Sequence, residues 1–164
     1  MPDPIIVMGP SGCGKSTLGR LLADALGLSF VEGDDLHPPA NRRRMARGQA
    51  LTDADRIPYL DAIAEALTDD PRSVASCSAL KRAYRDRLRA RLPGLLFVHP
   101  IVDRDELADR MSRRAGHFMP VSLLDDQLDA LEPLAPDETG MTLDGSLQVS
   151  AQLGIVLKQL GRRS

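Results

Sequence analysis

A glycine-rich segment near the N-terminus carries the residue types that bind a phosphate chain. Residues 9–16 satisfy the pattern G-x-x-x-x-G-K-[ST]. Its glycines let consecutive backbone N–H groups converge on an anion, and the start of a following helix adds partial positive charge. Lys15 can reach the β- and γ-phosphate oxygens, and the Ser16 hydroxyl can coordinate Mg²⁺. Cys13 is expected to be a tolerated loop residue with its thiol facing the phosphates. The predicted ATP-binding residues here are Gly9, Pro10, Ser11, Gly12, Cys13, Gly14, Lys15, Ser16 and Thr17.

Other motifs narrow the class of nucleotide-binding protein. A GTPase needs an Asn-Lys-x-Asp element, but the only asparagine is Asn41, and Arg42 follows it. Residues 137–140 match D-x-x-G, yet they follow a proline-containing loop rather than a strand, so we treat the match as accidental. A small phosphotransferase remains, in which an aligned hydroxyl, a carboxylate and several cations promote phosphoryl transfer.

Candidate groups for the acceptor side follow the second and third expected strands. Asp34 can accept a hydrogen bond from an acceptor hydroxyl and take its proton. The alternative is that Asp34 and Asp35 only cap a turn. His37 is either a substrate ligand or a spacer beside two prolines, and Lys81 is a plausible point charge for a carboxylate or phosphate.

Arginines cluster in three places, and we expect the third cluster to act in the chemistry. Most helical arginines only solvate a helix face. Arg110, Arg113 and Arg114 differ because they lead into the non-helical Gly116–Pro120. This arrangement suits a short lid, over about residues 110–124, that brings an arginine to the transferred phosphoryl group.

The elements that must position these groups alternate along the chain. Apolar patterns predict strands at 5–8, 28–31, 73–77, 95–98 and 141–143, and helices at 18–26, 53–67, 80–92, 104–114, 123–131 and 146–160. The His37-Pro38-Pro39 segment is expected to break regular structure. The alternation predicts a three-layer α/β fold, in which a parallel five-stranded sheet has helices on both faces and binds ligands at the carboxyl ends of its strands. We expect one domain over residues 1–164, including the lid.

Composition excludes several partners and cofactors. The net charge is −2, so no overall basic field gathers nucleic acid or an anionic membrane. No apolar run approaches the ~18 residues of a membrane-spanning helix. Two cysteines and three scattered histidines indicate neither a disulfide framework nor a zinc site. We therefore expect a cytoplasmic protein.

The sequence resembles gluconokinases of the thermoresistant bacterial type, a family of P-loop kinases related in fold to shikimate and nucleoside monophosphate kinases. The resemblance runs nearly end to end and rests on residues 9–17, 33–38, 51–56, 77–81, 84–86, 114, 116–120, 123–124, 127 and 131–133. It implies ATP- and Mg²⁺-dependent phosphorylation of the 6-hydroxyl of D-gluconate to 6-phospho-D-gluconate, commonly by a homodimer.

The resemblance also implies roles for individual residues. Lys15, Asp34 and Arg114 would be catalytic, Ser16 would bind the metal, and Arg110 would serve the nucleotide side of the lid. The residues facing the sugar acid would be Asp34, His37, Arg56, Lys81, Arg85, His117 and Gln127.

The sequence departs from the family pattern at three places. Glu32 replaces a common aspartate before Gly33-Asp34, and Asp126 stands where a serine is frequent. The added charge of Asp126 would weaken the binding of an anion if it faced the site. The third expected strand ends in Ser76-Cys77-Ser78 without a Walker-B aspartate, so Asp34 or water is expected to complete the metal coordination.

Two alternatives remain open. One is another small-molecule kinase of this fold, acting on shikimate or a different sugar acid. The other is a non-catalytic module that binds ATP and signals through a partner.

Overall fold

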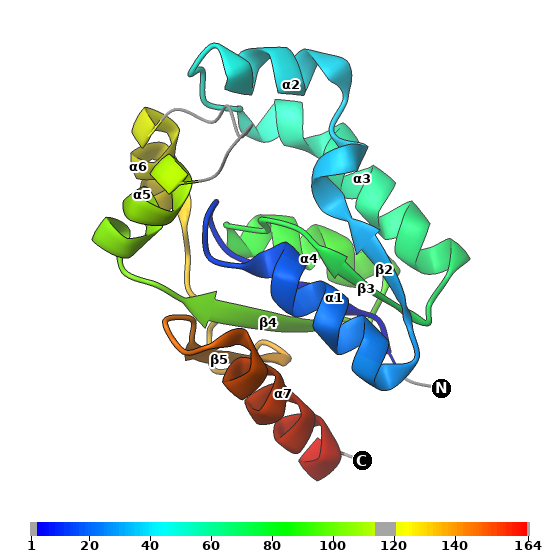
Figure 1. Cartoon of the computed structure of the whole chain (residues 1–164). Coiled ribbons are helices and arrows are strands. Elements are labelled where there is room, and N and C mark those ends of the chain that lie inside the picture. The colour runs from blue at the N-terminus through cyan, green and yellow to red at the C-terminus, as the bar shows by residue number, and fades with distance from the viewer. Residues whose placement is uncertain (1–2, 114–120, 164) are drawn as a thin grey trace.

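The computed structural model describes residues 3–113 and 121–163 and contains the expected parallel sheet (Figure 1). Its strands are β1 (Ile5–Val7), β2 (Ser29–Glu32), β3 (Ser73–Ser76), β4 (Leu96–Ile101) and β5 (Gly140–Asp144). They pair in parallel in the order β2-β3-β1-β4-β5. The prediction of a three-layer α/β fold is confirmed.

Helices connect the strands. They are α1 (Lys15–Leu26), the 3₁₀ helix η1 (Gly33–Leu36), α2 (Pro39–Ala46), α3 (Asp53–Asp69), α4 (Arg82–Arg91), α5 (Arg104–Arg113), α6 (Val121–Ala130) and α7 (Val149–Arg163). Thr52 caps α3 in a capping box with Asp55. Within the described residues no helix is long and apolar enough to cross a membrane.

The central strands are buried on both faces, which explains the unbroken apolar sequence of β1. In β1, Ile6 packs into one core cluster, whereas Ile5 and Val7 pack into the other. Side chains of α3 and α4 contribute to the first cluster, and side chains of α1 and α7 contribute to the second. Figure 1 shows α1 and α7 on one side of the sheet and α4 on the other. This alternation with a period of two residues is what a strand between two helical layers requires.

The helix α2 was not expected from the sequence. Pro39 occupies the first turn of α2, where a missing N–H costs no hydrogen bond and the fixed φ favours helix. The two prolines therefore end η1 and begin a new helix. Consequently Asn41 lies in the first turn of α2, close enough to His37 for their side chains to meet.

Glycine at position 33 brings the end of β2 against β3. A Cβ atom built at Gly33 would lie 1.8 Å from the carbonyl oxygen of Ser76, so no side chain fits there. The Gly33 N–H instead donates to the Ser76 hydroxyl over 3.0 Å. The carboxylates of Glu32 and Asp34 are thereby held beside the carboxyl ends of β3 and β1.

Candidate active site

The phosphate-binding loop follows β1 and leads directly into α1. Gly9, Gly12 and Gly14 have φ values of 137°, 87° and 91°, in a region that L-residues with side chains rarely adopt. Lys15 is the first residue of α1, and its Nζ donates to the Pro10 carbonyl over 3.1 Å, so the lysine lies across the loop that it closes. The local backbone thus has the geometry that the glycine spacing predicted.

A cavity of about 340 Å³ lies over this loop. It is lined by Ser11 to Thr17 and Asp34, together with Arg110, Leu147, Val149 and Gln152. Arg110 donates to the carbonyls of Gly12 and Gly145 over 3.1 and 3.0 Å, so it joins the loop to the segment after β5. Gly9 and Pro10 form the base of the loop rather than this lining.

The thiol of Cys13 does not face the phosphate site, which corrects the sequence-based expectation. Its side chain is buried, and Sγ lies 3.8 Å from the Met8 carbonyl. A Cβ atom built on Gly9 would lie only 2.7 Å from Sγ, so the thiol occupies the space beside this glycine. Burial raises the pKa of the Cys13 thiol. The residue therefore packs the underside of the loop and exposes no thiolate.

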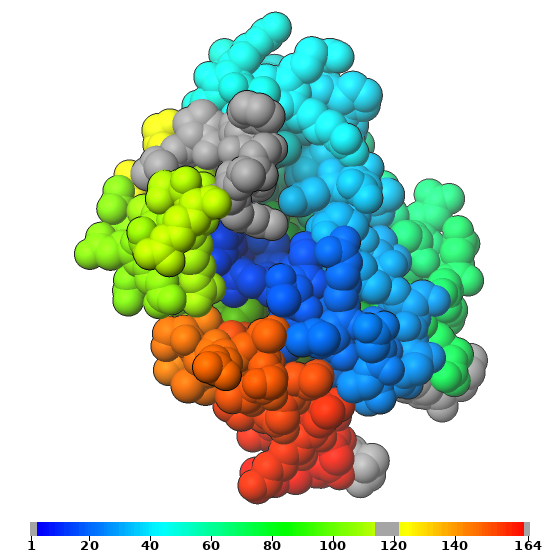
Figure 2. Space-filling model, in the orientation of Figure 1, coloured from blue at the N-terminus to red at the C-terminus, as the bar shows by residue number. Residues whose placement is uncertain are grey.

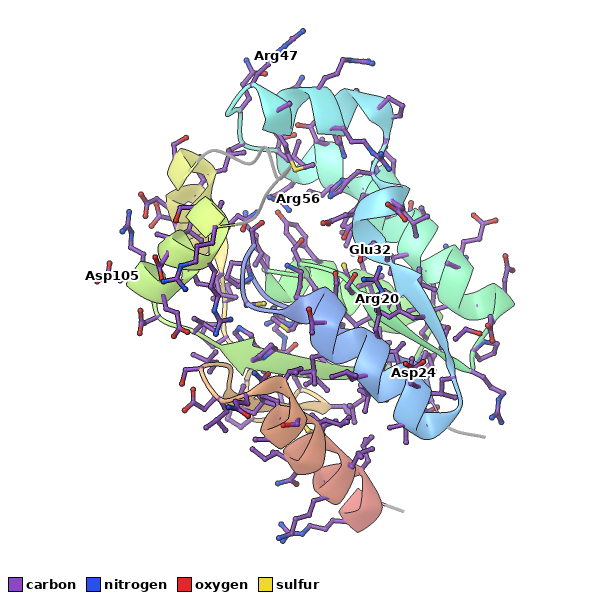
Figure 3. All side chains as sticks on the ribbon, in the orientation of Figure 1. Arg20, Asp24, Glu32, Arg47, Arg56 and Asp105 are labelled. Carbon is purple, nitrogen blue, oxygen red and sulfur yellow. The ribbon has the colours of Figure 1, made fainter. Side chains whose placement is uncertain are left out.

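Glu32 is a functional candidate that the sequence analysis noted only as a departure. Its Oε1 accepts hydrogen bonds from the hydroxyls of Ser16, over 2.9 Å, and Ser76, over 2.7 Å. Because Glu32 and Ser76 are register partners on β2 and β3, the neighbouring strand supplies the carboxylate that β3 lacks. Figure 3 shows Glu32 at the end of β2, and an exposed Arg20 lies 3.4 Å from its other oxygen.

The pair of Ser16 and Glu32 fits a magnesium ion. Mg²⁺ prefers hard oxygen donors and is usually held by one or two protein groups together with phosphates and waters. The hydroxyl and carboxylate oxygens here already lie within hydrogen-bond distance of each other. Asp34 or water was expected to complete the coordination; Asp34 lines both the cavity over the loop and a second, adjoining one.

A second cavity of about 310 Å³ adjoins the first. Ser11, Lys15 and Asp34 line both cavities. Figure 2 shows the blue surface of the N-terminal segment at the bottom of a hollow between α5, in yellow-green, and the light blue and cyan residues that follow β2. The expected substrate ligands His37, Arg56, Lys81 and Gln127 all line this second cavity.

Charged groups of both signs line this second cavity, which we call the acceptor cavity; the first cavity, over the phosphate-binding loop, is the nucleotide cavity. Lys81 Nζ donates to Asp53 Oδ1 over 3.0 Å, and the Tyr84 hydroxyl donates to the same oxygen. Both hydrogen bonds lower the pKa of Asp53, and the one from Tyr84 has the larger effect. Asp53 was not among the predicted ligands, although it lies three residues before Arg56. Asp126 also lines the cavity, so the extra negative charge does face the site.

Arg56 is the cation best placed for an anionic group of a substrate. Its guanidinium carbon lies 5.4 Å from the centre of the Tyr84 ring. Among the described residues it makes no ion pair, unlike Lys81. Figure 3 shows Arg56 extending from α3 toward the interior of the molecule.

Arg85 does not face the acceptor cavity, so its predicted role as a substrate ligand is wrong. Its side chain is fully buried and forms an ion pair with Glu138, with 2.7 Å between Nε and Oε1. Nη1 donates to the carbonyls of Ala79, over 2.9 Å, and Leu80, over 3.2 Å. Ala79 has a φ of 42°, so Arg85 holds a strained turn that leads to Lys81.

The end of α6 is attached to the phosphate-binding loop. The Ser11 N–H donates to Gln127 Oε1 over 2.8 Å. Gln127 therefore lies at the junction of the two cavities. Arg114 and His117, predicted for the lid, lie outside the described residues.

The fold and the two adjoining cavities define the class of protein. The sheet is parallel, and a phosphate-binding loop follows its central strand. The Asp34 carboxylate belongs to both the cavity over this loop and the second cavity. This is the architecture of a P-loop kinase that acts on a small molecule. A family model described as an AAA domain matches residues 5–134.

Comparisons with individual proteins identify the family. The gluconokinase of Gluconobacter oxydans is 49% identical over 148 residues, which cover 88% of this chain and 83% of that protein. The crystal structure of a gluconokinase from Sinorhizobium meliloti is 45% identical, with a TM-score of 0.86 over 99% of this chain and 98% of that one. A sugar kinase from a Janibacter species is 43% identical, with a TM-score of 0.92 over 98% of this chain and 95% of that one. The chain belongs to the gluconokinase family and is an ATP-dependent kinase.

Proposed function

We propose that the protein transfers the γ-phosphate of ATP to the 6-hydroxyl of D-gluconate, giving 6-phospho-D-gluconate and ADP. The observation that supports this most is that Lys15 and Asp34 line both the nucleotide cavity and the acceptor cavity. A phosphoryl group held by the loop would therefore lie next to the carboxylate that faces the acceptor. Membership of the gluconokinase family supports D-gluconate as the acceptor.

The nucleotide side supplies charge neutralisation. The loop amides and Lys15 bind the β- and γ-phosphate oxygens, where negative charge is spread in the transition state. Ser16 and Glu32 would hold Mg²⁺, which when bound neutralises phosphate charge and orients the oxygens. Arg110 closes the nucleotide cavity from α5 through its hydrogen bonds to Gly12 and Gly145. We assign Arg114 to the transferred phosphoryl group, as the resemblance implied.

The acceptor side positions the hydroxyl. Asp34 accepts a hydrogen bond from the 6-hydroxyl and takes its proton as the new O–P bond forms. Arg56 pairs with the gluconate carboxylate, because a planar guanidinium that forms no ion pair within the described residues can bind it through two parallel hydrogen bonds. Lys81, Asp53 and Gln127 have donors and acceptors for the polyol hydroxyls. We place His117 on the same substrate as a further ligand.

A coupled assay tests this proposal. Purified protein with Mg²⁺ and ATP should release ADP in the presence of D-gluconate, and ¹³C NMR of the product should place the phosphate on C6. Shikimate and other sugar acids should be turned over at least tenfold less efficiently. The control is Lys15→Met, which changes a loop position outside the core and should keep the fold while losing transfer. The absence of gluconate-dependent ADP release from folded wild-type protein, or a preference for another acceptor, would overturn the proposal.

Assembly and location remain predictions. The resemblance implies a homodimer, and the sequence composition predicts a cytoplasmic location; sedimentation and cell fractionation would test them.

A further inference from the structure

The orientation of the His37 ring in the acceptor cavity is fixed by its surroundings. The ring stacks on Tyr59 of α3, with 3.7 Å between the ring centres and 6° between the planes. The residue is 8% exposed and lines the acceptor cavity. The stack therefore defines the plane in which both ring nitrogens lie.

Asn41 determines which ring nitrogen can carry the proton. Its Nδ2 donates to the backbone carbonyl of Asp55 over 2.9 Å. A carbonyl oxygen only accepts, so the NH₂ group and not the amide oxygen must occupy this position. The same Nδ2 lies 3.3 Å from His37 Nδ1. The second N–H of the amide therefore points at Nδ1, which must present a lone pair.

The charges around the ring keep it neutral. Burial is the largest cause that lowers the pKa of His37 to about 4; Asp34 opposes it, and the cationic Arg56 and Arg42 act in the same direction as burial. These groups come from α3, α2 and η1, the three elements packed around the ring. A neutral imidazole with an accepting Nδ1 carries its proton on Nε2. Among the described residues, Nε2 has no hydrogen-bond partner.

We propose that Asn41 is a positioning residue that holds His37 as the Nε2–H tautomer, so that His37 donates a hydrogen bond to an oxygen of the bound acceptor. The identity of that acceptor as a sugar acid rests on the proposed function. The tautomer does not, because it follows from contacts within the protein alone. A fixed neutral donor adds specificity to a cavity in which Asp34, Asp53 and Asp126 supply only acceptors when ionised.

The tautomer can be read directly in the unliganded protein. The ¹⁵N shifts of labelled histidine at pH 7 distinguish a protonated from an unprotonated ring nitrogen, and the signals lost in His37→Gln assign this residue. We expect an unprotonated Nδ1 and a protonated Nε2. In Asn41→Asp, a carboxylate at the same place should draw the proton to Nδ1. A wild-type ring protonated at Nδ1, or one whose state is unchanged in both Asn41→Asp and Asn41→Leu, would overturn the proposal.

Kinetics test whether the Nε2–H donor is used. A glutamine amide at position 37 can place an N–H near the position of Nε2, whereas an asparagine reaches only as far as Nδ1. We expect His37→Gln to keep the KM for gluconate within a few-fold of wild type and His37→Asn to raise it about tenfold, as loss of one hydrogen bond implies. Asn41→Leu should raise KM with little change in kcat, because Lys15 and Asp34 are untouched.

The two proposals fail in different ways. Equal KM values for His37→Gln and His37→Asn would show that the donor is not used. Absence of gluconate turnover in the wild type would instead overturn the proposed function, and the NMR experiment would still report the tautomer.

Discussion

Glu32 would provide the metal-side carboxylate from β2, the strand next to the one where a Walker-B aspartate is usually sought. The hydroxyls of Ser16 and Ser76 both donate to its Oε1. Because β2 and β3 are in register at this point, the carboxylate lies at the same edge of the sheet as an aspartate on β3 would. At the scale of single residues, a carboxylate on β2 can therefore stand where an aspartate on β3 would, beside the Ser16 hydroxyl.

We expect Glu32→Gln to raise the Mg²⁺ concentration needed for half-maximal activity by roughly 10- to 100-fold, the range seen when support of a metal site is removed. Glutamine keeps an oxygen that accepts both hydrogen bonds but removes the negative charge. Initial rates over a MgCl₂ titration measure the shift. Glu65→Gln is the control, since Glu65 is exposed on α3. An unchanged magnesium dependence in Glu32→Gln would remove Glu32 from the metal site.

Asp34→Asn should lower kcat by about 10²- to 10⁴-fold, the usual contribution of a positioned general base. Calorimetric titration with ATP should show little change in affinity, because the loop amides are intact. Asp35→Asn is a matched control, since Asp35 is adjacent and lines neither cavity. Similar losses in both variants, or activity of Asp34→Asn within a few-fold of wild type, would contradict the assignment.

Sequence patterns located most of these residues but not all of their orientations. Gly9–Ser16 and Asp34 were recognisable because a local spacing and a position after a strand define them. The role of Arg85 was taken from the family resemblance, and the sequence could not correct it because a helical arginine near the active edge of a sheet looks the same whether it faces a cavity or the core. Its partner Glu138 lies 53 positions later, in a loop that no periodicity marks. Only the folded chain shows that pair.

At the scale of elements, α4 connects the core to the acceptor cavity. Arg85 on α4 holds the Ala79–Leu80 turn, and that turn leads to Lys81 at the cavity. Similarly, the short α2 presents Asn41 to His37. The sequence did not predict α2, because the two prolines at 38 and 39 were interpreted only as ending regular structure, whereas they also begin a helix. The positions of β1 and β4 were predicted well, since the apolar runs Ile5–Val7 and Leu96–Val98 between two helical layers are distinctive.

Arg85→Met should destabilise the fold by roughly 3–5 kcal/mol, because it leaves the buried Glu138 without its main partner. Arg87→Met on the same helix removes an exposed pair with Asp61 and should cost at most about 1 kcal/mol. Urea denaturation measures both. At low temperature the folded Arg85→Met enzyme should keep its KM for gluconate within a few-fold. A large rise in KM without loss of stability would restore Arg85 as a substrate ligand.

At the scale of the whole molecule, buried titratable groups couple the fold to pH. Burial, with nearby cations, lowers the pKa of both His37 and His99 to about 4. Burial alone would raise the pKa of Glu138, but hydrogen bonds from Arg85, the Ala135 N–H and Arg89 outweigh it and lower this pKa to about 2. Each of these groups binds protons more tightly in the unfolded chain than in the folded one.

The free energy of unfolding should therefore fall as the pH drops. The two histidines contribute between pH 6.5, their ordinary pKa, and about 4, and Glu138 contributes between 4.5 and about 2. Denaturant titrations at pH 7, 6, 5 and 4 measure the trend. His37→Gln should reduce the slope of unfolding free energy against pH between pH 6.5 and 4. The loss of unfolding free energy caused by Glu138→Gln should become smaller below pH 4.5. Stability that is constant from pH 7 to 4 would contradict these assignments.

The common lining of the two cavities by Lys15 and Asp34 has a stereochemical consequence. With the nucleotide in one cavity and the acceptor in the other, the attacking oxygen and the leaving oxygen would lie on opposite sides of one phosphorus atom. The thiols of Cys13 and Cys77 are buried, so neither can relay the group through a covalent adduct. We expect a single direct displacement between the two substrates, which would invert the configuration at phosphorus.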